Sequence, residues 1–281
     1  MGFPSVMLVV QMREEGPAMK NASSPSGMAR AAGLAYGWLA FGMTFAFFAH
    51  LVIFLGNMPG LSEPWVSPSV DVGPTSAPFM AALIDLGLVA LFGVQHSAMA
   101  RPSFKAWWTR IVPQGLERST YVMAASLVGF IMVLFWQPIP LVIWDVSAGF
   151  GEFFLWALFG LGWALLLASG ISFNLFDLLG IRQARAWYQG RPPPPLVLKT
   201  NWLYDWMKHP MYAGVLLGLW MTPHMTAGHA LIAGGFTLYI LIAMRFEERD
   251  LSRNFGDAYQ AWRSGCPHAQ PRPETDARAA R

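Results

Sequence analysis

The stretch MYAGVLLGLWMTPHMTAGHALIAGGFTLYILIAMR, from Met211 to Arg245, decides how this chain folds. It is almost wholly apolar, and it is too long for a single membrane-crossing helix, which needs roughly 20 residues. Pro223 lacks a backbone N–H and Gly228 tolerates many backbone conformations, so the chain can reverse direction here. We therefore predict a helical hairpin with a short first arm, Met211–Met221, and a longer second arm, His229–Arg245.

The composition places this hairpin in a membrane protein. The chain has 281 residues, of which 54% are hydrophobic and only 12% are charged, whereas about a quarter of a soluble domain is charged. Four further apolar runs approach or reach the length of a span: Leu34–Leu55, Phe79–Met99, Ser119–Gln137 and Glu152–Asn174. We predict an all-α, polytopic membrane helical bundle of about five spans, the last of them a hairpin.

The basic residues indicate how the bundle is oriented. The 19 Lys and Arg residues fall before the first span, between the second and third, between the fourth and the hairpin, and after the hairpin. Loops 57–78 and 138–151 and the hairpin turn have none. The positive-inside rule then predicts a multi-pass membrane protein with both termini in the cytoplasm. The net charge of +3 is explained by these flanks, so we expect no nucleic-acid partner.

The domain organisation is simple. Residues 1–28 are rich in Gly, Pro, Ser and Met and are predicted to be a disordered extension, and residues 266–281 a disordered tail. The membrane domain then covers residues 29–265. The single cysteine, Cys266, allows no internal disulfide and no multi-cysteine metal site, so we expect no metal.

Polar residues gather at the cytoplasmic end of the second span. Gln95, His96 and Ser97 lie about one turn inside the boundary marked by Arg101, and polar side chains at such a depth face protein or a water-filled cavity. One interpretation is a cluster that bridges helices. The other is the wall of a substrate pocket in which His96 accepts a proton near neutral pH. Deeper in this span, Asp85 is either a structural partner or part of a proton relay.

A second polar group follows the fourth span. Its members are spaced to fall along one face of a short amphipathic helix: Asn174, Asp177, Arg182 and Gln183. This helix either anchors the chain at the membrane interface through Trp187 and Tyr188, or adds polar groups to a pocket.

The hairpin begins with features of a binding site. Pro210 suits the first turn of a helix, which makes His209 the N-cap residue. Backbone N–H groups at such an end attract anions, including carboxylates. Tyr204 and Tyr212 flank this end, and Gly214 with Gly218 allows close helix approach.

The hairpin ends with the carboxylate pair Glu247 and Glu248, and Tyr259 follows. The pair either continues a helix into water or binds a cation such as an ammonium group. Because the two ends of a hairpin lie side by side, donors at one end and carboxylates at the other suit a zwitterionic ligand.

The chain resembles the integral-membrane methyltransferases in its C-terminal motifs KHPMYAG and RFEERDL, the latter followed by FGDAY. That superfamily includes the isoprenylcysteine carboxyl methyltransferases and the NnrU-like proteins. The upstream motifs FGVQHSAMARPSFKAWWTR, ERSTYV, FDLLGIRQ and TPHMTAGH narrow the resemblance to the bacterial methanethiol S-methyltransferases. It covers residues 33–265, and Lys208 stands where the superfamily usually has Arg.

The resemblance implies a cofactor module at about residues 200–262 on the cytoplasmic side, S-adenosylmethionine as cofactor, and a small volatile thiol, methanethiol, as substrate. It also implies the bacterial inner membrane as location. It places the cofactor at Tyr204, His209, Tyr212, Gly214, Glu247, Glu248 and Tyr259. The candidate catalytic residues are His96, Asp177 and Arg182, and the pocket candidates are Gln95, Ser97, Asn174 and Gln183.

Two alternatives remain at this point. An isoprenylcysteine-type enzyme predicts a lipid-sized opening between spans, whereas a small-thiol enzyme predicts a nearly closed pocket. A non-enzymatic NnrU-like membrane protein would leave the paired cofactor residues unexplained.

Overall fold

The protein is described by a computed structural model over residues 25–58, 68–146, 148–192, 203, 207 and 209–263, without the side chains of 250, 251 and 253–263. Within these residues, five helices are long and apolar enough to cross a membrane. They are α1 (Gly27–Gly56), α2 (Pro78–Ala100), α4 (Gln114–Leu134), α5 (Phe150–Ser172) and the first part of α10 (Ala227–Arg263). The predicted all-α membrane bundle is confirmed.

The predicted hairpin is confirmed as well. Its first arm is α9 (Pro210–Trp220), with His209 as N-cap residue, and its second arm is α10. The second arm runs to Arg263, well beyond the predicted end at Arg245. The residues that follow Arg245 are mostly good helix formers, and the first of them include no Gly or Pro. The helix therefore continues into its polar part.

Two short strands at the hairpin turn were not predicted. Strand β1 (Val142–Asp145) pairs antiparallel with β2 (His224–Thr226), and Asp145 faces His224. The pairing of β1 with β2 holds the hairpin turn against the segment that precedes α5. Strands this short carry no clear alternation of apolar and polar residues, so the sequence gives little sign of them.

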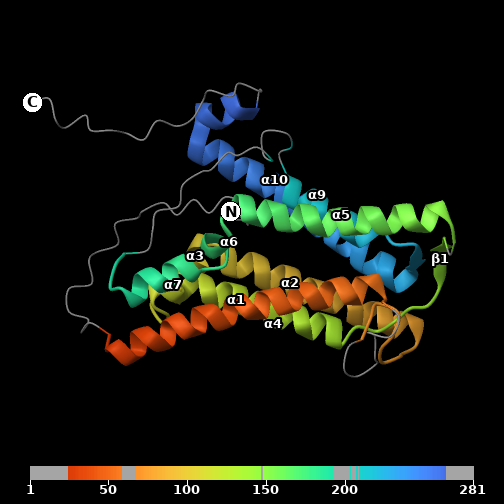
Figure 1. The fold of residues 1–281 in the computed structure, drawn as a ribbon, viewed down its shortest axis with the longest axis horizontal. Coiled ribbons are helices and arrows are strands. Elements are labelled where there is room, and N and C mark those ends of the chain that lie inside the picture. The colour runs from red at the N-terminus through yellow and green to blue at the C-terminus, as the bar shows by residue number, and fades with distance from the viewer. Residues whose placement is uncertain are drawn as a thin grey trace, which may run out of the picture.

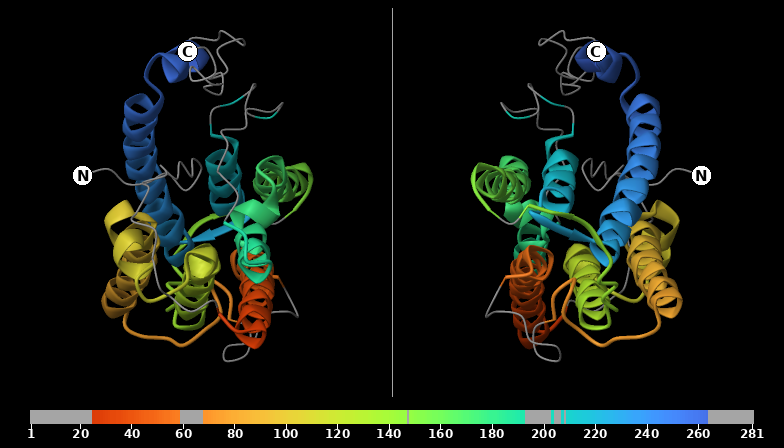
Figure 2. Two further views of the ribbon diagram at one scale, coloured as in Figure 1. Left: turned by 90° about the vertical axis from the view of Figure 1, so that its left-hand side faces the viewer. Right: turned by 90° about the vertical axis from the view of Figure 1, so that its right-hand side faces the viewer.

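The helices form two layers (Figure 1). Helices α1 and α4 pack against each other, and α2 packs against α4 and α10. Helix α5 lies along α9 on the other side of the bundle, as the end-on views in Figure 2 also show. Three short helices cluster at the end of the bundle where α1 begins: α3 (Pro102–Trp108), α6 (Leu175–Leu178) and α7 (Ile181–Tyr188).

We call that end the basic end, because the described Lys and Arg residues lie at or near it, and the end that carries β1 and β2 the strand end. The strand end is closed by a polar network. Asp71 accepts hydrogen bonds from Thr226 (2.6 Å) and Asn57 (3.1 Å), and burial raises the pKa of its carboxyl group. Asp85 has a structural partner at the same end, since its Oδ1 accepts a 2.9 Å bond from the backbone N–H of Gln137.

Glycines bring α5 and α9 into close contact. A Cβ atom added at Gly214 would lie 2.7 Å from the carbonyl oxygen of Gly162, and one added at Gly218 would lie 2.8 Å from the ring of Trp163. Both distances are shorter than real Cβ contacts, so neither position accepts a larger residue without movement of α9. The close approach predicted from this glycine pair is confirmed.

Helix α1 begins at Gly27, capped by Ser26, two residues before the predicted end of the N-terminal extension. Residues 1–24 and 264–281 lie outside the described part. The single amphipathic helix predicted over Asn174–Gln183 is two helices. Gly180 adopts φ +91 between α6 and α7, and Asn174, with φ +71, caps α6.

Candidate functional site

An apolar cavity of about 390 Å³ lies inside the bundle. Six helices contribute to its wall, namely α1, α2, α4, α5, α6 and α9. Most of the wall is hydrocarbon, and the hydroxyl groups of Thr44 and Ser126 bond to each other at 3.1 Å. The wall also includes three residues that can carry out chemistry, and they lie together toward the basic end: His96, Arg118 and Tyr121.

His96 is held in place but keeps one nitrogen available. Its Nε2 lies 2.9 Å from the hydroxyl oxygen of Tyr121, and its ring stacks on Phe92 with centroids 5.4 Å apart. Nδ1 is buried and has no hydrogen-bond partner among the described residues. Buried polar atoms are normally satisfied, so Nδ1 is the ring nitrogen that remains for a ligand.

Arg118 is a buried cation in the same wall. Its side chain is only 8% exposed, its Nε donates a 2.7 Å hydrogen bond to the carbonyl of Leu178, and its guanidinium group lies 5.3 Å from the ring centroid of Tyr121. In the described part of the chain, no carboxylate lies within ion-pair distance of it. A buried charge without a counter-ion is costly, so this position favours an anionic ligand.

An ion pair outside the spans lies beside Arg118. Lys105 in α3 lies 3.7 Å from Glu117 at the start of α4. Burial lowers the pKa of the Lys105 amine, Glu117 opposes that shift, and Arg118 adds to it. The neighbouring carboxylate is thus engaged with Lys105.

The two ends of the hairpin meet next to this cavity. The hydroxyl group of Tyr212 in α9 donates a 2.9 Å hydrogen bond to Oε2 of Glu247 in α10, whose side chain is 2% exposed. The ring of His209 stacks on that of Tyr212, with centroids 5.6 Å apart. Met211, the residue before Tyr212 in α9, lines the cavity. The structure therefore brings three of the predicted cofactor residues together.

The remaining cofactor candidates are placed less directly. Glu248 is half-buried and follows Glu247 in α10. Tyr204 and the side chain of Tyr259 lie outside the described residues. Gly214 faces α5, where its lack of a side chain serves helix packing.

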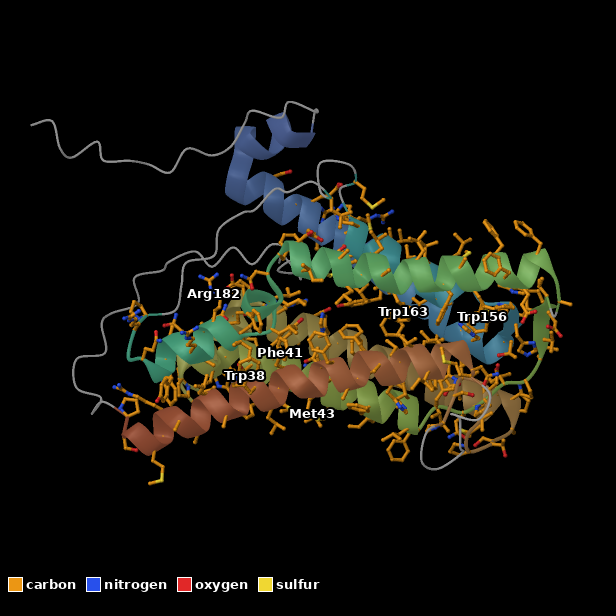
Figure 3. The ribbon with its side chains drawn as sticks, in the orientation of Figure 1. Trp38, Phe41, Met43, Trp156, Trp163 and Arg182 are labelled. Carbon is orange, nitrogen blue, oxygen red and sulfur yellow. The ribbon has the colours of Figure 1, made fainter. Side chains whose placement is uncertain are left out.

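Two of the three catalytic candidates lie elsewhere. Asp177 and Arg182 form an ion pair with each other, and neither lines the cavity. Arg182 sits in α7 at the basic end (Figure 3), and its side chain is 46% exposed.

The pocket candidates also have other partners. Gln95 donates to the sulfur of Met99, and Gln183 donates to the carbonyl of Asp177. The hydroxyl of Ser97 lies 3.2 Å from that of Tyr239 in α10, and Asn174 caps α6. They support the helices around the cavity without lining it.

Arg118 and Tyr121 were not predicted as site residues from the sequence. Both lie in the motif ERSTYV, and their spacing places them about one turn apart on the same face of α4. An arginine at the fifth position of a helix that then becomes apolar reads as an ordinary basic flank. No feature of the sequence around Tyr121 marked it as a site residue.

The cavity differs from the nearly closed pocket expected for a small-thiol enzyme. It is large, and some of its wall residues also reach the outer surface of the bundle. In the described part of the chain, no three His, Cys, Asp or Glu side chains group as metal ligands do.

Known proteins resemble the chain over most of its length. A methanethiol S-methyltransferase from Mycobacterium tuberculosis is 41% identical over 228 residues, which cover 81% of this chain and 91% of the relative. One from Pseudomonas deceptionensis is 40% identical, covering 84% and 88% respectively. Nurim from Sus scrofa is a more distant relative, at 29% identity over 76% of this chain and 85% of its own. No family model matches the chain, and no solved structure matches it.

Proposed function

The chain belongs to the methanethiol S-methyltransferase family, and we propose that it transfers the methyl group of S-adenosylmethionine to methanethiol, which gives dimethyl sulfide. The observation that carries the proposal is the position of the cavity. Its polar end, with His96 and Arg118, lies next to the junction of Tyr212 and Glu247.

The hairpin junction fits the amino-acid end of the cofactor. A helix leaves its first backbone N–H groups without intrahelical partners, and at the start of α9 these belong to Met211 and Tyr212, close to Glu247. Backbone donors suit a carboxylate, and the buried carboxylate of Glu247 suits an ammonium group. We assign cofactor binding to Tyr204, His209, Tyr212, Glu247, Glu248 and Tyr259, and support of α9 to Gly214.

When bound, the cofactor supplies an electrophilic methyl group on a sulfonium. The chain's own task is to present a thiolate, which is the reactive form of a thiol. Nδ1 of His96 accepts the proton of the thiol, while Nε2–H donates to the hydroxyl oxygen of Tyr121 and so fixes the tautomer. Arg118 stabilises the negative charge that remains on the sulfur.

The catalytic cation is therefore Arg118 in this proposal, in place of Arg182. The reason is geometric: Arg182 is paired with Asp177 outside the cavity, whereas Arg118 lines it. The hydrocarbon wall excludes water, which strengthens the interaction between a charge and the guanidinium group. Holding the sulfur in one place also lowers the entropic part of the barrier.

The proposed orientation follows from charge. The basic end faces the cytoplasm under the positive-inside rule, which places both termini and the hairpin junction on that side. The bacterial origin of the first-named relatives supports the cytoplasmic membrane as location. The proposal requires no nucleic acid and no metal ion.

Headspace gas chromatography tests this function. Purified protein given methanethiol and S-adenosylmethionine is expected to release dimethyl sulfide in proportion to the amount of protein. Reactions without the cofactor, and reactions with a Glu247→Ala variant, serve as controls. If protein that demonstrably binds the cofactor releases no more dimethyl sulfide than these controls, the proposed function is wrong.

A further inference from the structure

The cavity is much larger than methanethiol requires. Its volume is about 390 Å³, whereas a water molecule accounts for about 30 Å³ of liquid, and methanethiol has only one more heavy atom than water. Pockets for drug-sized ligands begin at about 300 Å³. A site shaped for methanethiol alone would be filled by side chains, because protein interiors are close-packed.

The cavity is elongated along the bundle, with chemistry at one end. On α1 its wall runs from Thr44 to Val52, and on α4 it runs from Arg118 to Ser126. Each stretch is about 12 Å long at 1.5 Å per helical residue. Because Thr44 bonds to Ser126, the stretch on α1 begins where the stretch on α4 ends, so together they extend about 24 Å along the bundle. His96 and Arg118 lie toward the basic end, the hydroxyl pair of Thr44 and Ser126 lies midway, and the far half of the wall is hydrocarbon.

Part of the wall is also the outer surface of the bundle. Phe45 and Phe48 of α1 are 39% and 38% exposed, and Leu167 of α5 is 48% exposed, yet all three line the cavity. Figure 3 labels Trp163, another wall residue, between α5 and α1. Exposed apolar side chains of spanning helices face lipid, so a hydrocarbon chain can pass from the bilayer between α1 and α5.

We infer that the cavity accepts thiols with linear hydrocarbon chains of six carbons or more, which reach it through the bilayer, and that the protein S-methylates them. A six-carbon chain spans about 8 Å, because three extended bonds span about 3.8 Å, so it fits within the cavity length of about 24 Å. The inference rests on the proposed function and adds a substrate class to it: apolar alkanethiols.

The reaction balances as it does for methanethiol. The thiol proton moves to Nδ1 of His96, and the sulfur forms a bond to the methyl carbon of a sulfonium donor. The bond between that carbon and the donor sulfur breaks, and its electron pair stays on the donor, which becomes a neutral thioether. The product is an alkyl methyl sulfide, which is apolar and returns to the bilayer.

The same wall excludes charged thiols. Glutathione and cysteine carry ionised groups that would lose their hydration, and the far wall of the cavity offers no charged partner for them. Burying an unpaired charge costs far more than a hydrocarbon cavity returns. The cavity thus separates apolar from charged thiols more sharply than it separates short from long ones.

A thiol series tests the inference. Purified protein in lipid nanodiscs, saturated with the methyl donor, is given alkanethiols from methanethiol to octanethiol, and glutathione. Hexanethiol is expected to reach at least the kcat/KM of methanethiol, because the bilayer concentrates the thiol about fourfold for each CH2 group. Glutathione is expected to be inert. If methanethiol is methylated and hexanethiol is turned over 100-fold less efficiently, the inference fails and the proposed function stands. If neither thiol is methylated, both fail.

Two variants shorten the cavity, and a third is the matched control. Ala125→Phe fills its interior, and Ala49→Phe narrows it from the exposed rim of α1, where folding is not at risk. Each is expected to lower the ratio of hexanethiol to methanethiol kcat/KM at least tenfold. Ala157→Phe, on an exposed face of α5 outside the cavity, is expected to leave the ratio within twofold. An unchanged ratio in both cavity variants overturns the inference.

Binding without the methyl donor gives an independent measurement. Hexyl methyl sulfide, the expected product, should raise the Tm of the wild-type protein, because a ligand that binds only the folded state stabilises it. The Ala49→Phe variant should show a clearly smaller rise, and Ala157→Phe should match the wild type. Equal shifts in all three proteins would mean that the sulfide acts through the lipid and not through the cavity, which would contradict the inference.

Discussion

The hydroxyl group of Tyr212 donates a hydrogen bond of 2.9 Å to Glu247, and this bond joins the two arms of the terminal hairpin. Tyr212 lies in the first turn of α9, and Glu247 lies far along α10, where the helix leaves its apolar part. A nearly fully buried carboxylate at the end of a membrane helix is costly unless it is bonded. The pair therefore fixes the geometry of the junction at which we place the cofactor.

Tyr212→Phe is expected to weaken this junction. The change removes the donor and leaves a buried carboxylate oxygen without that bond, which typically costs about 1–3 kcal/mol. Both the Tm and the cofactor affinity should fall, as measured by thermal unfolding and calorimetry. The matched change Tyr188→Phe, at an exposed tyrosine of α7, should alter neither. Equal behaviour of the two variants would show that the bond has no role.

His96→Phe is expected to lower kcat for methanethiol about 100-fold or more, since a positioned proton acceptor typically contributes 10²–10⁴-fold. Cofactor affinity should stay the same, because His96 is in α2 and not at the hairpin junction. The control is His50→Phe, which changes the only other histidine of the first two spans and does not touch the cavity wall. A His96 variant with near wild-type kcat would remove the proposed proton acceptor.

Arg118→Gln is expected to lower kcat about tenfold to 100-fold, because hydrogen bonds to charged groups contribute about 1.5–3 kcal/mol. Arg118→Lys should recover part of the loss, since it restores the charge without the bond geometry of the guanidinium group. The comparison is Arg182→Gln, measured with the same thiol. If its loss equals or exceeds that of Arg118→Gln, the catalytic cation has been placed at the wrong arginine.

Gly214→Ala is expected to lower the Tm by several degrees, because its Cβ would lie 2.7 Å from backbone atoms of α5. Displacement of α9 should also weaken cofactor binding. Gly234→Ala is the matched control in α10, where an added Cβ meets nothing within 4 Å. There the better helix propensity of alanine should keep or raise the Tm. A pair of equal Tm values would contradict the packing argument.

The sequence predicted the spans and the hairpin because their physics is local. An apolar run of sufficient length has to cross the bilayer as a helix, and Pro223 and Gly228 mark the turn within the last run. The junction of Tyr212 with Glu247 also followed, because the arms of a hairpin bring its two ends together. Helix α10 extends further than predicted because its polar part is still composed of good helix formers.

The cavity could not be predicted in the same way. Its wall comes from six helices, and no short pattern reveals which faces of separate spans meet. His96 stood out as a histidine within an apolar run, but Arg118 read as a basic flank. The spacing of Asp177 and Arg182 suits one face of a single helix, whereas Gly180 separates two helices between them and the two side chains pair with each other.

Calorimetric titration of S-adenosylmethionine into the wild-type protein and a Glu247→Gln variant tests the central claim most directly. The substitution keeps the shape of the side chain and its ability to accept the bond from Tyr212, but it removes the charge proposed to hold the ammonium group. We predict a dissociation constant about 10- to 100-fold larger for Glu247→Gln, and no change for Glu152→Gln, the same substitution at the first turn of α5. Equal affinities for the wild type and Glu247→Gln would contradict the account.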